Sequence, residues 1–89
     1  MLPVDCPPTH PGEALAEDFL GPLEISEEEI AERTKLSLRY IRELIAGEAD
    51  CTVDAAIRLA NELHTRPEFW LSLQVRCDMW HMQDRDVAN

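Results

Sequence analysis

The sequence has little of what an enzyme needs. Among its 89 residues there are three glycines, and none belongs to a Gly-rich loop of the kind that cradles phosphate groups. No nucleophile motif is accompanied by a matching general base. We therefore expect no catalytic activity and no catalytic residue.

Long apolar runs are missing as well. No uninterrupted stretch comes near the roughly 18 apolar residues that a membrane-spanning helix requires. The first residues, "MLPVDCPPTHPG", show no basic segment followed by an apolar one, so nothing indicates a secretion signal. These two absences predict a cytoplasmic protein that does not contact a membrane.

Cysteine is scarce, and its pattern argues against both disulfides and metal. The three cysteines, Cys6, Cys51 and Cys77, are odd in number and widely spaced, which favours reduced thiols. Cys77 and His81 are four residues apart, as are Cys6 and His10, so a Cys2His2 zinc set is arithmetically possible. The spacing matches no zinc motif strongly, and prolines around the first pair prevent a regular helix there. We expect no metal and no other cofactor.

No segment alternates apolar and polar residues for long enough to indicate a strand. Apolar residues recur instead at helical spacing, which predicts a single all-α domain of five helices over residues 10–82. The Pro-rich residues 1–9 are expected to form an extended arm. Residues 83–89 are polar, and we expect them to fray.

Capping and breaker residues set the expected bounds of the first two helices. Pro11 suits the first turn of helix one, which should end before the breaker pair Gly21-Pro22. Ser26 and Glu29 form a capping box, in which each side chain satisfies a backbone donor of the other residue. Helix two is therefore expected from Ser26 to about Thr34.

The remaining three helices follow from similar signals. Ser37 is a good N-cap for helix three, and Gly47 is placed to end it. Thr52 should cap helix four, and Pro67 should open helix five. In the pair of helices over residues 26–47, the small Ala31 would permit a close crossing, and Ile41 would fill the angle between the helices.

Positive charge is rare but clustered. The chain carries 18 acidic and eight basic residues, a formal net charge of -10. Half of the basic residues nevertheless lie within residues 33–42, which contain no acid: Arg33, Lys35, Arg39 and Arg42. Two short helices with a tight connection, the second displaying basic residues, are typical of a helix-turn-helix. A helical hairpin whose basic residues only solvate one face would show the same pattern.

Six stretches, in order, resemble a known family: "HPGE" and "FLGPL" at the two ends of helix one, "EIA", "LIAG", "TVDAAIRLANEL" and "RPEFWLSLQ". Residues 10–80 resemble the HigA/VapI family of antitoxins within the Xre-type helix-turn-helix class. The resemblance implies a five-helix, lambda-repressor-like domain. It also implies an antitoxin that dimerises, represses its own operon by binding operator DNA, and neutralises a basic HigB/RelE-like toxin that cleaves mRNA.

The resemblance assigns roles to residues of the helix pair. Helix 27–34 would lie across the DNA backbone, and helix 37–46 would enter the major groove. Arg33 and Lys35 would contact phosphates, and the expected base readers are Ser37, Arg39, Tyr40, Arg42 and Glu43. An arginine that offers two donors to guanine contributes about 1 to 3 kcal/mol of discrimination.

Three features depart from the family pattern. Glu27 stands where a glutamine is common, near the DNA backbone, and its charge would repel phosphate. Lys35 occupies a turn position where glycine is frequent, so a left-handed backbone there would carry strain of about 1 kcal/mol. The loop "EAD" after Gly47 is acidic where relatives often carry basic residues.

Two further surfaces are expected. A homodimer interface is expected on helix five, formed by Phe69, Trp70, Leu73, Cys77 and Trp80. Trp70, Leu73, Met79 and Trp80 would equally suit the core of one chain. Glu13, Glu17 and Asp18 of helix one are expected to contact the toxin, to which a net charge of -10 would steer the protein. These acids would equally suit a solvated face.

An alternative is an Xre-type regulator or interaction module without a toxin. The antitoxin hypothesis predicts a neighbouring reading frame for a small basic protein, whereas the alternative predicts none.

Overall fold

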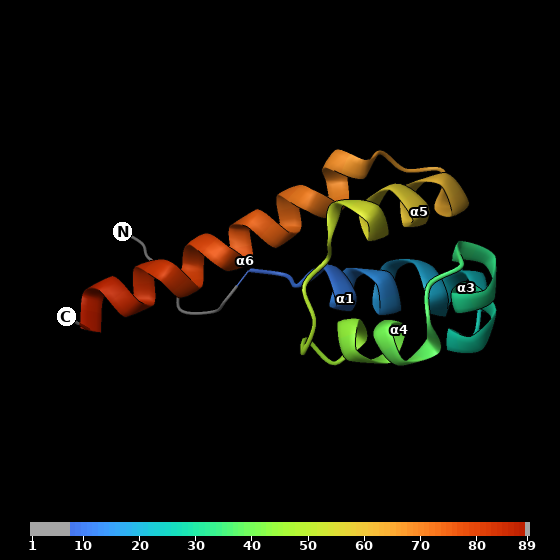
Figure 1. Cartoon of the computed structure of the whole chain (residues 1–89), viewed down its shortest axis with the longest axis horizontal. Helices are drawn as coiled ribbons and strands as arrows, with labels where there is room; N and C mark the ends of the chain where they lie inside the picture. The colour runs from blue at the N-terminus through green and yellow to red at the C-terminus, as the bar shows by residue number, and fades with distance from the viewer. Residues whose placement is uncertain (1–7, 89) are drawn as a thin grey trace.

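The computed structural model describes the backbone of residues 8–88 and the side chains of residues 8–82. This part of the chain contains helices and no strand, which confirms the all-α prediction (Figure 1). The elements in order are α1 (Pro11–Ala14), the π-helix η1 (Leu15–Leu20), α2 (Gly21–Leu23), α3 (Glu27–Thr34), α4 (Leu38–Ile45), α5 (Val53–Leu63) and α6 (Pro67–Ala88). Because α1, η1 and α2 follow one another without a break, they form one helical segment, and residues 8–88 contain the five segments expected.

The first segment passes through Gly21 and Pro22, so the prediction that it ends before this pair is wrong. It continues to Leu23, and Glu24 then ends it with a left-handed φ of 55°. The Gly21 N–H donates to the carbonyl of Ala16, five residues back, as in a π-helix. This wider turn moves the backbone carbonyls away from the positions where a proline ring strikes them in a regular α-helix. The breaker pair is thereby accommodated.

The predicted N-caps are confirmed. The hydroxyls of Ser26, Ser37 and Thr52 each accept a backbone N–H from three residues further on, at 3.0, 3.0 and 3.1 Å. Only half of the expected capping box forms, because the Glu29 carboxylate pairs with Arg33 one turn further along α3. Side-chain capping thus fixes where α3, α4 and α5 begin.

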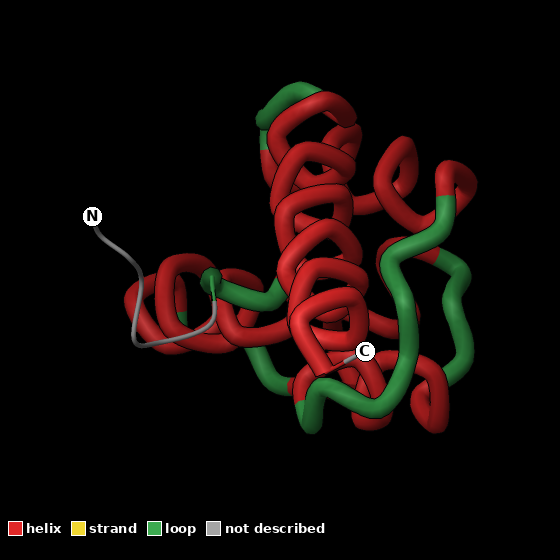
Figure 2. Tube along the Cα trace, turned by 90° about the vertical axis from the view of Figure 1, so that its left-hand side faces the viewer, coloured by secondary structure: helices red, strands yellow, loops and turns green. Residues whose placement is uncertain are grey.

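Helix α6 runs through Ala88, whereas we expected the helix to end near Met82. Its first half packs on α5, and its second half extends away from the other helices (Figure 1). Seen along the long axis, the C-terminal end of α6 lies in front of the rest of the chain (Figure 2). The molecule is therefore elongated, measuring 43 × 22 × 21 Å.

One apolar core joins the five segments. Each contributes a side chain that solvent does not reach, among them Leu15, Ile30, Ile41, Leu59 and Trp70. Ala31 and Ile41 are both buried where α3 and α4 pack together, as the sequence predicted. Full burial of an isoleucine side chain contributes about 2 kcal/mol to stability, so Ile41 helps to hold the helix pair together.

Gly12 allows α1 to approach the end of α4 closely. A β-carbon at Gly12 would overlap the carbonyl group of Leu44 and lie 2.8 Å from the Cα of Ile45. His10 caps the same turn, since its Nδ1 accepts the Gly12 N–H at 3.0 Å. The "HPGE" stretch therefore serves both to start the helix and to let two backbones touch.

We expect Gly12→Ala to lower the free energy of unfolding by about 2 to 3 kcal/mol, because α1 and α4 must separate to admit the methyl group. Gly21→Ala is the matched control, since a β-carbon there meets only the Ala16 carbonyl oxygen at an ordinary 3.4 Å. Urea unfolding followed by circular dichroism measures both. Equal stability of the two variants would contradict the close approach.

Candidate nucleic-acid interface

A tight turn joins α3 to α4 and sets the angle between them. Lys35 has φ of 66° and ψ of 20°, the left-handed conformation considered from the sequence. It therefore carries strain of about 1 kcal/mol that a glycine would avoid. Gly47, with φ of 78°, follows α4 in the same backbone region and donates its N–H to the Leu44 carbonyl. This confirms that Gly47 ends helix three of the prediction.

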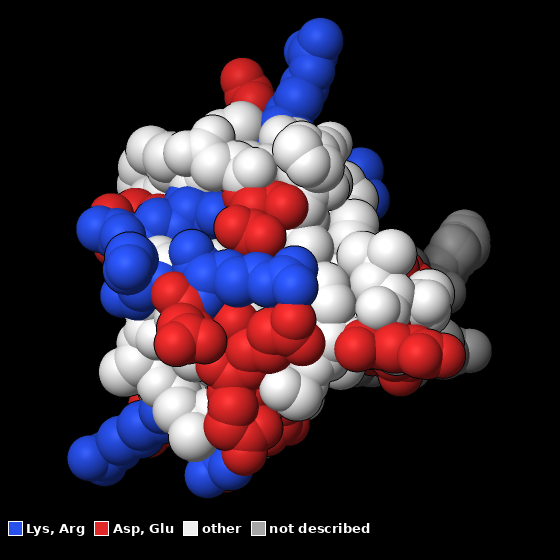
Figure 3. Space-filling model, turned by 90° about the vertical axis from the view of Figure 1, so that its right-hand side faces the viewer, with Lys and Arg blue, Asp and Glu red and all other residues white. Residues whose placement is uncertain are grey.

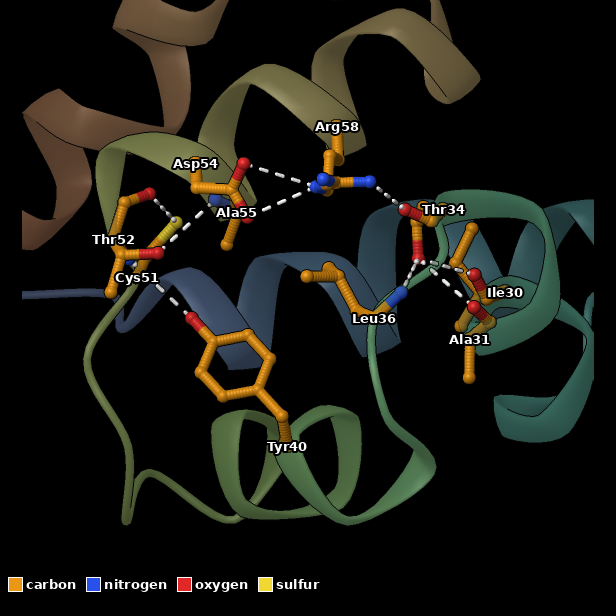
Figure 4. A network of polar contacts seen from close by, with 10 residues as sticks. All are labelled: Ile30, Ala31, Thr34, Leu36, Tyr40, Cys51, Thr52, Asp54, Ala55 and Arg58. Atoms are coloured by element: carbon orange, nitrogen blue, oxygen red, sulfur yellow. Dashed lines mark hydrogen bonds and ion pairs between the residues drawn. The ribbon is translucent and has the colours of Figure 1, made fainter.

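Thr34 fixes the end of α3 from inside the protein (Figure 4). Its buried hydroxyl donates to the Ile30 carbonyl at 2.7 Å and accepts the Leu36 N–H at 3.4 Å. The carbonyl of Thr34 accepts a hydrogen bond from Arg58 of α5 at 3.2 Å. Asp54 in turn holds Arg58, with distances of 3.0 and 3.1 Å. The sequence analysis did not predict that Arg58 holds the end of α3 or that Asp54 orients Arg58. The four-residue spacing of Asp54 and Arg58 is nevertheless typical of an ion pair within one helix.

Tyr40 is only partly available to DNA. Tyr40 is half-buried, and its hydroxyl donates to the Asp50 carbonyl at 2.6 Å. The same hydroxyl accepts the Thr52 N–H at 3.4 Å (Figure 4). Burial raises the pKa of this hydroxyl, so it stays protonated and able to donate. Tyr40, an expected base reader, thus also ties α4 to the loop before α5.

Gln74 of α6 holds the same loop from the other side. Its Oε1 accepts the Cys51 N–H at 2.7 Å, and its Nε2 donates to carboxylate oxygens of Asp50 at 3.2 Å and Asp78 at 3.0 Å. Gln74 is buried, and so is Cys51, whose thiol pKa burial raises to about 11. A thiol with this pKa is protonated and unreactive at neutral pH. The loop that follows α4 is thus anchored to both α4 and α6.

The arginines expected to meet DNA are paired with nearby carboxylates. Arg42 lies 3.2 Å from Glu27 and 3.4 Å from Glu28, both at the start of α3. Arg39 pairs with Glu43 one turn further along α4, at 3.2 Å, while 88% of its side chain stays exposed. Two of the expected base readers, Arg39 and Glu43, thus pair with each other.

The two basic residues expected at phosphates differ from each other. Arg33 pairs with Glu29 and lies 3.6 Å from Glu62 of α5. Lys35 is exposed and forms no ion pair with the described side chains. Figure 3 shows the result on this side of the molecule, where acidic side chains lie among the basic ones. The basic cluster of the sequence is therefore largely neutralised in space.

The structure divides the expected dimer residues into two groups. Trp70 and Cys77 are buried within one chain, so their assignment to a dimer surface is wrong. Trp70 is enclosed by the rings of Phe19 and Phe69, and its Nε1 donates to Thr65. Phe69 is 38% exposed, while Leu73 and Trp80 are half-buried. Sequence periodicity cannot separate these groups, because core and interface residues are apolar alike.

The exposed apolar face of α6 lies elsewhere. Val75, Met79 and Met82 follow one another at helical spacing, and 52 to 57% of each is exposed. Soluble monomers rarely leave such residues together without a use.

The acids expected to contact a toxin are exposed on the first helical segment. Glu13 lies on α1, and Glu17 and Asp18 lie on η1. An open groove of about 500 Å³ is lined by Phe19, which follows Asp18 in the sequence, and by Phe69 and its neighbours, including the charged residues Arg66 and Glu68.

The described residues offer no site for a metal ion. No group of three or more His, Cys, Asp or Glu side chains gathers within them. Cys77 faces the carbonyls of Pro8 and Thr9, at 3.8 and 3.5 Å, and Cys6 lies outside the described residues.

None of the described helices combines the length and apolarity needed to cross a membrane.

Two short packed helices joined by a tight turn, the second of which displays arginines, define a helix-turn-helix protein. No protein-family model matches the chain. It is 36% identical over 78 residues to antitoxin HigA-1 of Vibrio cholerae, which covers 88% of this chain and 73% of that protein. It is 34% identical over 76 residues to an uncharacterized HTH-type transcriptional regulator of Haemophilus influenzae, covering 85% and 71%.

Solved structures show the same likeness. An addiction module antidote protein of a HigA family from Coxiella burnetii matches with a TM-score of 0.85 and 31% identity, covering 93% of this chain and 90% of that one. Antitoxin HigA of Pseudomonas aeruginosa, solved with the higBA promoter, matches with a TM-score of 0.86 and 28% identity, covering 91% and 88%. The chain belongs to the HigA/VapI-type antitoxin family of the Xre helix-turn-helix class.

We expect Gln74→Leu to lower the free energy of unfolding by about 2 kcal/mol, because the buried Cys51 N–H loses its acceptor. Hydrogen exchange at the Cys51 amide should accelerate in this variant. Ser72→Ala on the same helix is the control, since it removes only an exposed hydroxyl and should change stability by less than about 0.5 kcal/mol. Unchanged exchange at Cys51 would show that Gln74 does not anchor the loop.

Proposed function

We propose that this protein is the antitoxin of a type II toxin-antitoxin system. It binds the operator DNA of its own operon as a homodimer and thereby represses transcription. It also neutralises a HigB/RelE-like toxin that cleaves mRNA. The observation that carries this proposal is the position of α4, which the Tyr40 and Gln74 contacts hold at the surface with Arg39 and Arg42 exposed.

Arg39 is the arginine most available for DNA. It is held by a single pair within its own helix, and such pairs contribute only about 0.3 to 0.5 kcal/mol. A guanine edge or a phosphate therefore displaces Glu43 at little cost. Arg42 joins it on α4, whereas Arg33 and Lys35 reach the DNA backbone. Ser37 and Tyr40 mainly position the helix, because their hydroxyls cap α4 and hold the loop.

A homodimer supplies the second recognition helix. Helix-turn-helix dimers place two such helices about 34 Å apart along one face of DNA. The projecting half of α6, with Val75, Met79 and Met82 exposed and Trp80 half-buried, is the surface we assign to the second copy. Phe69 and Leu73 remain candidates from the predicted set.

The toxin is the partner of the acidic remainder of the chain. A ribonuclease must attract RNA phosphate, so a basic toxin is steered toward a protein with net charge -10. We assign its contact to Glu13, Glu17 and Asp18, which are exposed on α1 and η1.

We expect binding to a duplex from upstream of its own gene, with two protomers per site and a steep dependence on salt. With four cations per protomer, a dimer neutralises at most about eight phosphates. The slope of log K against log salt should therefore be no steeper than about -7. Arg39→Gln should weaken binding by about 1 to 3 kcal/mol, whereas Arg76→Gln on α6 should leave it unchanged. Fluorescence anisotropy and analytical ultracentrifugation measure affinity and stoichiometry. A flat salt response, or no binding at low salt, contradicts operator binding.

Reversing the charges of Glu17 and Asp18 to lysine should slow association with the small basic protein encoded by the neighbouring reading frame, by about tenfold at low salt. Reversal of two acids outside this surface, Glu32 and Glu48, is the control for net charge alone. Stopped-flow fluorescence gives the association rates. Equal rates for the two double variants would move the toxin surface away from η1.

A regulator without a toxin is the second candidate, favoured by the likeness to the Haemophilus influenzae regulator. It shares the predicted operator binding. The neighbouring reading frame separates the two functions, because only an antitoxin requires a toxin gene there.

A further inference from the structure

We propose that Glu27, supported by Glu28, is an intramolecular competitor for Arg42, which DNA must displace before α4 can use this arginine. The inference rests on the operator binding proposed above and assigns to these acids control over its strength. Arg42 donates from Nε to Glu27 at 3.2 Å and from Nη2 to Glu28 at 3.4 Å. These are two of the donors that an arginine offers to the edge of a guanine or to a phosphate.

The partners of Arg42 differ from those of Arg39 in their origin. Glu43 sits on the same helix as Arg39 and moves with it into the groove. Glu27 and Glu28 instead belong to α3, the other helix of the pair, which lies across the DNA backbone in a helix-turn-helix. An acid there meets phosphate directly. Engaging DNA through Arg42 thus requires both breaking the pair and moving two carboxylates away from the nucleic acid.

Glu27 also occupies the start of α3. Backbone N–H groups and the helix dipole make the first turn of a helix favourable for an anion, and a DNA phosphate would otherwise use it. The carboxylates of the first turn, which lie at positions 27, 28 and 29, supply that anion from within the chain. One side chain therefore competes with DNA at two attractive points, the helix start and the arginine.

The exposure of the pair makes it a modulator of affinity. About half of the Arg42 side chain and 41% of Glu27 remain exposed, so water and salt weaken the attraction between them. DNA can therefore break the contact, but it does so against a standing competitor. Neutralising Glu27 should tighten DNA binding by about tenfold at low salt. The slope of log K against log salt should also become more negative by about 1 for each bound protomer, because the released Arg42 neutralises one more phosphate.

The experiment compares Glu27→Gln with Glu32→Gln in the intact protein. Glu32 lies on the same helix, is exposed and forms no ion pair with the described side chains, so its substitution changes net charge equally. Binding to the duplex from upstream of its own gene is measured by anisotropy over a series of salt concentrations, and thermal melting verifies that both variants fold. We expect the tenfold gain and the steeper slope for Glu27→Gln and less than a twofold gain for Glu32→Gln.

A double-mutant cycle with Arg42→Gln identifies the target of the competition. The gain from Glu27→Gln should largely disappear when Arg42 is absent. Equal gains for the two glutamate variants, or a full gain without Arg42, would overturn the inference while leaving operator binding intact. Absence of binding by both the parent protein and Glu27→Gln would overturn operator binding and the competition with it.

Discussion

The structure depends on the close contact between the backbones of α1 and α4 at Gly12. Because residue 12 has no β-carbon, the first helical segment can rest directly against the end of the candidate recognition helix. Leu15 and Leu44 are then buried in one core with Trp70 of α6, the last helix of the chain to contribute to that core. A rigid support for α4 follows from this packing, since close-packed interiors do not yield to small displacements.

Polar contacts complete what the core begins. The loop after α4 lies between Tyr40 and Gln74, which bind the carbonyl and the carboxylate of the same residue, Asp50. The other end of the helix pair is held by Arg58 through the Thr34 carbonyl. Within residues 8–82, every deeply buried side-chain nitrogen or oxygen has a hydrogen-bond partner. These contacts present α4 at the surface in a single orientation, and DNA binding needs that orientation to be set in advance.

Electrostatics gives the surface a mixed character. The chain has the helix pair of a DNA-binding protein, yet carboxylates of α3, α4 and α5 pair with its arginines. Such a surface would bind DNA more weakly than a fully basic one and would favour sites that offer arginine a better partner. The acidic excess elsewhere suits a basic protein. Both properties fit the proposed function, in which the protein binds operator DNA and a basic toxin.

Local signals in the sequence predicted the helices well. Ser26, Ser37 and Thr52 cap helices where expected, because capping involves residues only a few positions apart. The Gly21-Pro22 pair misled, since the cost of a proline depends on the geometry of the preceding turn, and a π-helix changes that geometry. Trp70 and Cys77 misled in another way: apolar spacing indicates which face of a helix is buried but not what covers it.

The all-α class, the helix pair at 26–47 and the clustering of Arg33, Lys35, Arg39 and Arg42 can all be read from neighbouring residues, because propensity, capping and charge are local properties. The contacts of Glu27 and Glu28 with Arg42, and the hold of Gln74 on the loop after α4, arise instead from the folding of distant segments onto one another. These pairs are separated by 14 to 24 residues along the chain. They meet only because the packing of apolar side chains brings their helices together, and no local pattern records that meeting.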